Sequence, residues 1–390
     1  MKRKCASRSL KNAILLSVEV LMLPAAIFLS SCQGSAAEVP EYLVKVVEDV
    51  KSIHAPDYRA ELFQIELQRK GNQIIVFGEV TDPRLRQHLL DSLRSAAGDI
   101  TFLDSIAVLP TEELRPNVYG IVCVSVANMR REPSLRAELV NQTLLGTVLD
   151  LYKEEDGFYY TRNRDRYLGW VDESSLTVVD SLAVAEWRRG SRVVCTANYG
   201  LVRDRAGASG NPITDLVPGV VLKKTGQNGS WTKVQTPDGQ VGYVEKELVI
   251  DEAQLRSDKV DRGKLVSLAK SYLGIPYLWG GTSTKGFDCS GFVQTVFRMN
   301  NIHLPRDASQ QVHEGERVEP GKNFEKVREG DLLFFGSTPA RITHVALYLG
   351  NQHYIHAAGL VRINSLNPRD SFYSEYRLNT LQAIKRVLPG

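Results

Sequence analysis

The chain has 390 residues and a formal net charge of +3, but a basic leader supplies more than this total. Residues 1–31 hold five basic side chains and one acidic side chain, so the remainder carries a net charge of about −1. No basic patch favours nucleic acid, and that class of partner is excluded. The length suffices for roughly three or four domains.

The first 32 residues have the pattern of a lipoprotein signal peptide. An apolar run, interrupted by Glu19, ends at the lipobox Leu29-Ser30-Ser31-Cys32, in which Cys32 would become lipidated; an ordinary signal peptide lacks this cysteine. We therefore expect an anchor at Cys32 and a location in the bacterial cell envelope, facing the periplasm or otherwise outside the cytoplasm. A simple transmembrane anchor is the alternative, and no other segment is apolar enough to span a bilayer. The basic residues before the run are Lys2, Arg3, Lys4, Arg8 and Lys11.

Residues 38–112 are predicted to form a small α+β domain of αββαβ order. The domain is faintly similar to the BON domain of envelope proteins, and a spacer or docking role is the expected one. Its predicted elements are a helix near 41–52, a hairpin of 61–68 and 74–80 through Lys70-Gly71-Asn72, a helix over 83–97 with Pro83 in its first turn, and a strand over 102–109.

Residues 113–180 and 190–252 read as two copies of one β module, joined by a polar linker near 181–190. The first opens at 123–130 and closes at 167–171, and the second opens at 195–203 and closes at 241–244. Both resemble bacterial SH3 (SH3b) domains, which are small β-barrels. Cys123 and Cys195 occupy similar strand positions and are expected to be small core residues. So few cysteines in so long a chain do not indicate a disulfide framework. The turn signals between strands are Asp156-Gly157, Asn228-Gly229 and Asp238-Gly239.

Asp288-Cys289-Ser290-Gly291 marks the candidate nucleophile. The glycine-rich approach 277–281 precedes it, and Phe292, Val293, Val296 and Phe297 follow at the spacing of one apolar helix face. Cys289 is therefore expected at a helix N-terminus, where backbone amides and the helix dipole stabilise a thiolate. A buried core cysteine is the alternative.

Two histidines follow on predicted strands, at 342–350 and 353–357. His344 can face His356 directly only across an odd-numbered loop centred on Gly350, and a three-residue loop would provide this. His344 would then lie toward the thiol, and His356 behind it would hold one tautomer of His344. Zinc bound by His344, His353 and His356 is the competing interpretation. However, residues 353 and 356 lie on opposite faces of a regular strand.

Residues 258–390 resemble the NlpC/P60 family of papain-like cysteine peptidases that cut bacterial cell-wall peptides. The resemblance implies Cys289 as nucleophile, His344 as base and His356 as orienting residue. We expect no cofactor and no metal. It also implies that Tyr277 helps to stabilise the oxyanion together with the Cys289 amide, although a packing role is the alternative. The matching motifs, in chain order, are Pro276-Tyr277-Leu278-Trp279-Gly280-Gly281, Phe287-Asp288-Cys289-Ser290-Gly291-Phe292, Leu304-Pro305-Arg306-Asp307, Gly330-Asp331-Leu332-Leu333-Phe334-Phe335 and His344-Val345-Ala346-Leu347-Tyr348-Leu349-Gly350.

Two SH3b modules ahead of the catalytic domain are similar to the arrangement in γ-D-glutamyl-L-diamino-acid endopeptidases. This resemblance implies a murein peptide with a free N-terminal L-alanine, cut between γ-D-glutamate and the diamino acid. It assigns Asp307 to the terminal amine, Glu138 and Tyr167 to the SH3b contribution, and Asp288 and Ser290 to the peptide. Two acids suit an ammonium group taken from water. Surface charge and barrel packing are the alternatives for Glu138 and Tyr167. The position after Asp307 is Ala308, and if a serine hydroxyl were required there to bind the glutamate, its absence would leave the exact peptide open.

The expected protein is therefore a multidomain α+β cysteine peptidase. A papain-like NlpC/P60 domain follows two SH3b barrels and a small αββαβ domain. Two alternatives stay open: a broader D,L-endopeptidase or amidase that acts on intact cell wall, and an inactive scaffold that binds the wall.

Overall fold

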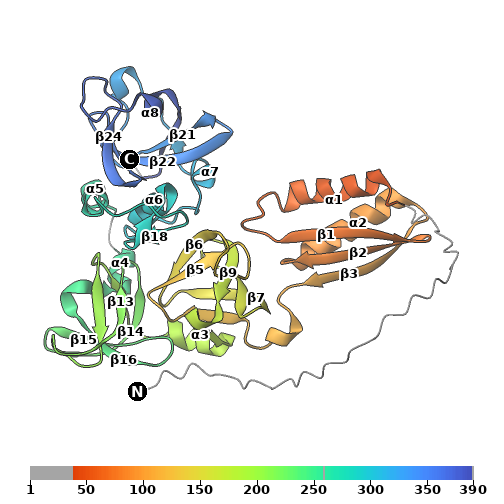
Figure 1. Cartoon of the computed structure of the whole chain (residues 1–390), viewed down its shortest axis with the longest axis horizontal. Helices are drawn as coiled ribbons and strands as arrows, with labels where there is room; N and C mark the ends of the chain where they lie inside the picture. The colour runs from red at the N-terminus through yellow and green to blue at the C-terminus, as the bar shows by residue number, and fades with distance from the viewer. Residues whose placement is uncertain (1–37, 258–259, 389–390) are drawn as a thin grey trace, which may run out of the picture.

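The computed structural model describes residues 38–257 and 260–388, and the predicted lipobox at Cys32 lies outside this range. Figure 1 shows the first SH3 barrel in the middle, with the N-terminal domain on one side, the second barrel on the other and the C-terminal domain above. None of the helices in these two ranges is long and apolar enough to cross a membrane.

The N-terminal domain has the predicted αββαβ order. Its helices pack on a sheet of order β1-β2-β3, in which β1 and β2 form an antiparallel hairpin and β3 runs parallel to β2. Asp82 caps the second helix by accepting from the Arg84 amide, and Pro83 takes the first turn, where its missing N–H costs nothing. The elements are α1 (Glu41–His54), β1 (Phe63–Lys70), β2 (Gln73–Val80), α2 (Pro83–Ala97) and β3 (Thr101–Val108).

The two SH3 barrels share one topology, which confirms the internal repeat. The first sheet has the order β10-β4-β7-β8-β9-β5-β6, and the second repeats this order from β17 to β13. The strands of the first barrel are β4 (Tyr119–Val122), β5 (Val126–Arg130), β6 (Leu139–Leu144), β7 (Val148–Glu155), β8 (Phe158–Arg162), β9 (Leu168–Asp172) and β10 (Leu176–Val179). Those of the second are β11 (Arg192–Cys195), β12 (Gly200–Arg203), β13 (Pro212–Leu216), β14 (Val221–Asn228), β15 (Trp231–Gln235), β16 (Val241–Glu245) and β17 (Val249–Asp251).

The segment between the barrels is a helix rather than the expected polar linker. Asp180 caps α3 (Ser181–Arg188) by accepting from the Ala183 amide. The buried Trp187 indole donates to the Gly146 carbonyl at 3.0 Å, so the helix is fastened to the first barrel. The two cysteines also differ: Cys195 is 1% exposed, as expected of a core residue, whereas Cys123 is only partly buried.

The C-terminal domain, for which the sequence predicts catalysis, packs helix α6 against a six-stranded sheet of order β20-β25-β21-β22-β23-β24. One apolar core fills the space between them, and the helix face 292–297 that the sequence predicts is fully buried in it. The elements, after α4 (Glu252–Ser257), are α5 (Arg262–Ser271), β18 (Thr282–Ser283), β19 (Gly286–Phe287), α6 (Cys289–Arg298), α7 (Ala308–Gln311), β20 (Glu316–Arg317), β21 (Leu332–Thr338), β22 (Arg341–Gly350), β23 (His353–Ala358), β24 (Leu360–Ser365), α8 (Glu375–Asn379) and β25 (Leu381–Arg386).

Candidate active site

Cys289 is the first residue of α6, as the sequence predicts. Asp288 caps this helix, because its Oδ1 accepts from the Gly291 amide at 2.7 Å. Two backbone N–H groups favour the ionised form of the thiol, that of Val345 on β22 and that of Ser290 in the first turn of α6. Val345 follows His344 on β22, so the sulfur lies beside the strand that carries the predicted base.

His344 and His356 contact each other directly, with 2.7 Å between His344 Nε2 and His356 Nδ1. They share a sheet face, but not across the predicted three-residue loop. The turn has two residues, Asn351 and Gln352, both with positive φ. A bulge at Leu349 shifts the register, so that Tyr348 pairs with Tyr354. Without that extra residue the two imidazoles would lie on opposite faces; with it they are diagonal neighbours.

A third group continues this chain of hydrogen bonds. Asn364 on β24 donates from Nδ2 to the Phe372 carbonyl at 2.9 Å, and a carbonyl can only accept. The Asn364 Oδ1 therefore faces His356 Nε2, 3.0 Å away, and accepts its proton. Neutral His356 then accepts at Nδ1 from His344 Nε2–H. In this network His344 Nδ1 carries no proton, which is the state that a general base requires.

Both members of the predicted nucleophile–base pair are neutral in the unliganded chain. Burial raises the pKa of Cys289 to about 11, and the nearby Asp288 carboxylate adds to this shift. Burial likewise holds the pKa of His344 well below its usual value, with further lowering by Arg377 and His356. Desolvation of the buried thiol therefore opposes the stabilisation that the backbone amides at the helix N-terminus provide.

Tyr277 lies at the edge of the same core. Its backbone N–H donates to the Gly359 carbonyl at 2.9 Å, and its side chain packs against the cluster that contains Cys289. Burial, together with the nearby Cys289 and Asp288, raises the pKa of the Tyr277 hydroxyl to about 12. The hydroxyl therefore remains a proton donor at neutral pH, which is the form that an oxyanion requires.

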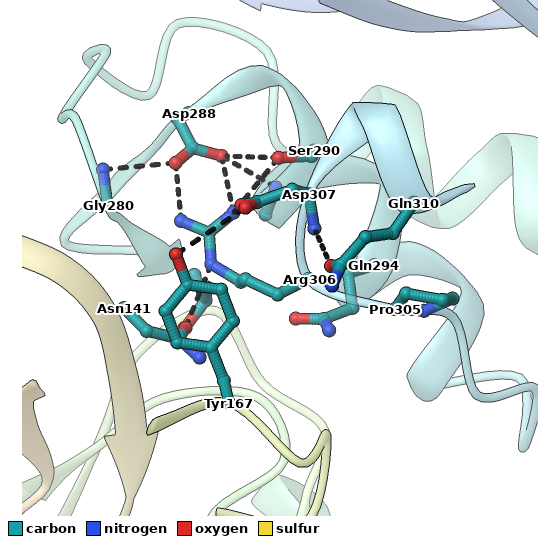
Figure 2. A network of polar contacts seen from close by, with 12 residues as sticks. Asn141, Tyr167, Gly280, Asp288, Ser290, Gln294, Pro305, Arg306, Asp307 and Gln310 are labelled. Atoms are coloured by element: carbon teal, nitrogen blue, oxygen red, sulfur yellow. Dashed lines mark hydrogen bonds and ion pairs between the residues drawn. The ribbon is translucent and has the colours of Figure 1, made fainter. Parts of the chain in front are cut away.

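A buried arginine organises the residues around the start of α6 (Figure 2). Arg306 is 1% exposed and forms a bidentate pair with Asp288, in which Nη1 donates to Oδ1 at 3.0 Å and Nη2 to Oδ2. Nη1 also donates to Ser290 Oγ at 2.9 Å, and Nε donates to Asn141 Oδ1 of the first barrel at 2.9 Å. With the Gly280 amide as a further donor, both oxygens of Asp288 are already hydrogen-bonded. Asp288 and Ser290, predicted to contact the peptide, thus also hold the helix start in place.

The three residues predicted for amine recognition lie at the contact between the first barrel and the catalytic domain. Tyr167 is buried in the barrel core, and its hydroxyl is 3.4 Å from Asp307 Oδ2, so packing and contact with the site occur together. Glu138 accepts from the Trp279 indole N–H at 2.9 Å. Both acids already have arginine partners: Asp307 pairs with Arg59 at 2.7 Å, and Glu138 pairs with Arg131 at 2.6 Å.

The three histidines considered as alternative zinc ligands do not all meet at one point. His353 contacts Asp370 Oδ2 at 2.9 Å instead of joining His344 and His356. Within the described part of the chain, no group of three or more His, Cys, Asp or Glu side chains is arranged to hold a metal ion.

Three residues with clear contacts to the site were missed by sequence reasoning. Arg306 was quoted within a motif, but its ion pair with Asp288, 18 positions away, has no local signal. Asn364 could have been found only by aligning a third strand with the histidine hairpin. Arg59 belongs to another domain altogether, 248 positions from Asp307, and nothing in its surroundings suggests a role.

Comparison with known proteins agrees with this geometry. A model of the NlpC/P60 family matches residues 274–382. A model described as a bacterial dipeptidyl-peptidase Sh3 domain matches 129–176, and one described as a bacterial SH3 domain matches 199–250. Together with Cys289 at a helix start and paired histidines on the facing sheet, these matches define a cysteine peptidase with SH3 modules.

The chain belongs to the NlpC/P60 family. It is 31% identical over 275 residues to Dipeptidyl-peptidase 6 of Lysinibacillus sphaericus, covering 68% of this chain and 98% of that protein. It is 36% identical over 116 residues to a gamma-D-glutamyl-L-lysine dipeptidyl-peptidase of Bacillus cereus, which is 29% of this chain and 34% of that protein. The crystal structure of an NlpC/P60 family protein from Bacillus cereus shares the fold, with a TM-score of 0.61 at 24% identity, covering 70% of this chain and all of that one.

Proposed function

We propose that the protein is a cysteine endopeptidase of peptidoglycan-derived peptides. Its preferred substrate would carry a free N-terminal L-alanine, and the bond cut would join γ-D-glutamate to the diamino acid. The single observation that carries the proposal is the contact of Asp307, the predicted amine acceptor, with Tyr167 of the first barrel. Two relatives support the substrate class, since their names specify dipeptidyl-peptidases, one of them acting on a γ-D-glutamyl-L-lysine bond.

The proposed reaction begins with proton transfer from Cys289 to His344. Because both groups are neutral and buried, we infer that substrate binding precedes formation of the ion pair. The thiolate attacks the γ-glutamyl carbonyl, and the Cys289 amide and Tyr277 hydroxyl donate to the oxyanion that forms. His344 returns the proton to the departing amine. Water then attacks the thioester, with His344 again as base, and releases the dipeptide.

Asp307, Glu138 and Tyr167 would bind the amine end of the peptide. An ammonium group leaves water at a large cost unless carboxylates compensate for it, so a site with two acids selects peptides whose N-terminus is unblocked. Asp288 and Ser290 would act on the side nearer the thiol, with Arg306 fixing both.

The broader wall hydrolase remains the second candidate. Other relatives are a peptidoglycan endopeptidase of Mycobacterium tuberculosis, 36% identical over 108 residues, and a probable one of Bacillus subtilis, 38% identical over 110 residues. These names support a location outside the cytoplasm or at the cell wall. We also propose the finer assignment, a lipid anchor on Cys32 in the cell envelope.

Defined murein peptides test the proposal. Incubation with L-Ala-γ-D-Glu-diaminopimelate should yield, by mass spectrometry, L-Ala-D-Glu and the unattached diamino acid, while intact sacculi release little soluble peptide. Release from sacculi at a comparable rate would instead favour the broader hydrolase. No product from either substrate would favour the wall-binding scaffold.

Asn364 provides a test of the hydrogen-bond chain behind the base. Replacing it with leucine removes the acceptor for His356 Nε2–H, and the preferred tautomer of His344 is lost with it. We expect kcat to fall by about 10-fold, the equivalent of one or two net hydrogen bonds, while KM changes little. Asn364→Asp keeps the acceptor and should retain more activity than Asn364→Leu. Its added negative charge should also move the acidic limb of the pH profile upward. Equal kcat for the leucine variant and the unaltered chain would refute this role.

A further inference from the structure

A short segment of the N-terminal domain reaches the residues proposed to bind the substrate amine. Residues 57–59 lie between α1 and β1, in the loop that points toward the catalytic domain in Figure 1. Arg59 Nη1 donates to Asp307 Oδ2 at 2.7 Å and to Ser309 Oγ at 3.0 Å. The Arg59 carbonyl accepts from the Leu168 amide at 2.6 Å, next to Tyr167. The segment thus contacts the catalytic domain and the first barrel at the same point.

Arg59 is held in position by a second carboxylate. Asp57 binds it in a bidentate manner, with Nε donating to Oδ1 at 2.7 Å and Nη2 to Oδ2 at 2.9 Å. Gln310 of the catalytic domain donates to Asp57 Oδ2 at 2.6 Å. The side chains of Arg59 and Asp307 are only 22% and 27% exposed, so water screens their attraction less than it screens a surface pair.

Tyr58, next to Arg59 in the chain, is connected to Glu138, the other predicted amine-binding acid, through Arg131. The Arg131 guanidinium lies over the Tyr58 ring, with 5.9 Å between Arg131 Cζ and the centroid of the ring. Arg131 Nε donates to Glu138 Oε2 at 2.6 Å. Both acids are therefore satisfied by arginines, and residues 58 and 59 touch both pairs.

We propose that Arg59 occupies the place of the substrate's N-terminal ammonium and is a specificity-determining residue for that end of the peptide. This inference rests on the proposed function, in which Asp307 accepts the amine. A guanidinium and an ammonium are both cationic donors, and the two compete for one carboxylate oxygen. A peptide with an unblocked amine must therefore displace Arg59 before it binds fully.

The surroundings permit this displacement. Asp57 can keep its bidentate pair when Arg59 leaves Asp307, so no buried charge is left without a partner. A cavity of about 230 Å³ borders Tyr58, Arg59, Arg131 and Tyr167 and gives the side chain space to move. The charges of Asp57, Arg59 and Asp307 sum to −1, so the cluster attracts an ammonium even before Arg59 moves.

Removal of the competing cation should tighten binding of the peptide. For Arg59→Ala we expect KM for L-Ala-γ-D-Glu-diaminopimelate to fall by about 5- to 20-fold, because the apparent affinity equals the intrinsic affinity multiplied by the fraction of molecules in which the site is free. The value of kcat should stay within about twofold, since displacement precedes the chemical steps. Preference for the tripeptide over its N-acetylated form should increase. Titration calorimetry in a Cys289→Ala background should show the same tightening of Kd without turnover.

Two further variants serve as controls. Arg59→Lys retains the cation and should leave KM near that of the unaltered chain. Arg86→Ala removes an arginine of the same domain that pairs with Asp104 away from the site, and it should change neither KM nor kcat. If Arg59→Ala does not fold, Arg59→Gln takes the place of that variant in both the kinetic and the calorimetric measurements. Glutamine keeps a hydrogen-bond donor to Asp57 but carries no charge.

The outcomes separate this inference from the proposed function. If the unaltered chain does not cleave the tripeptide, the proposed function fails, and the inference fails with it. If the chain cleaves the tripeptide but Arg59→Ala leaves KM and Kd unchanged, Arg59 does not compete for the amine site. If the variant binds more weakly, Arg59 is a direct substrate contact. Either of the last two results overturns the inference and leaves the proposed function intact.

Discussion

Cys289→Ala is expected to abolish peptide cleavage, with a loss of more than about a thousandfold in kcat/KM, because no other group can form the thioester. The fold should survive the change, since only the sulfur of a side chain 8% exposed is removed. Steady-state assays with the tripeptide measure the loss, and thermal melting checks the fold.

Cys195→Ala is the matched control for that experiment. Its thiol is also buried, at 1% exposure, but it lies in the core of the second barrel. Activity should therefore remain close to that of the unaltered chain. Substantial cleavage by Cys289→Ala would mean that another group is the nucleophile.

The second large effect is expected on stability, from Arg306→Met. The substitution keeps an unbranched apolar side chain but leaves the Asp288 carboxylate buried without its cation, which costs about 3–5 kcal/mol. The start of α6 should shift as well, and kcat/KM should fall. Urea unfolding of the catalytic domain within the whole chain measures the free energy of unfolding.

Arg317→Met separates the effect of a buried charge from that of losing any arginine. Its pair with Glu319 is 72% and 69% exposed, so its loss should cost about 1 kcal/mol or less. The double variant Arg306→Met with Asp288→Asn should lose less stability than the two single changes added together, because no unpaired charge then remains. Equal costs for Arg306→Met and Arg317→Met would contradict the buried network.

The sequence predicts well whatever depends on local pattern. The αββαβ order, the repeated barrels and the helix that begins at Cys289 all follow from periodicity, turn residues and caps. The two histidines were expected on one face of the sheet, but the three-residue loop predicted to place them there was wrong. A bulge at Leu349, which no local signal marks, corrects the register of a two-residue turn.

The remaining features depend on contacts between segments far apart in the chain. Helix α3 was predicted to be a linker because the contact that fastens it joins Trp187 to the Gly146 carbonyl of the first barrel, 41 positions away, and no local pattern shows that contact. The raised pKa of Cys289 results from burial of its thiol, and the hydrophobic periodicity of the sequence does not reveal how deeply one side chain is buried. The contact of Arg59 with Asp307 joins two domains, so neither domain's pattern contains it.

Recognition of an unblocked N-terminus is the central claim, and one comparison tests it most directly. The kcat/KM of the unaltered chain should be measured for L-Ala-γ-D-Glu-diaminopimelate and for the same peptide acetylated at its N-terminus. Acetylation removes the charge that Asp307 and Glu138 would bind, so we expect a fall of about 100-fold or more. Equal kcat/KM values for the two peptides would contradict the account.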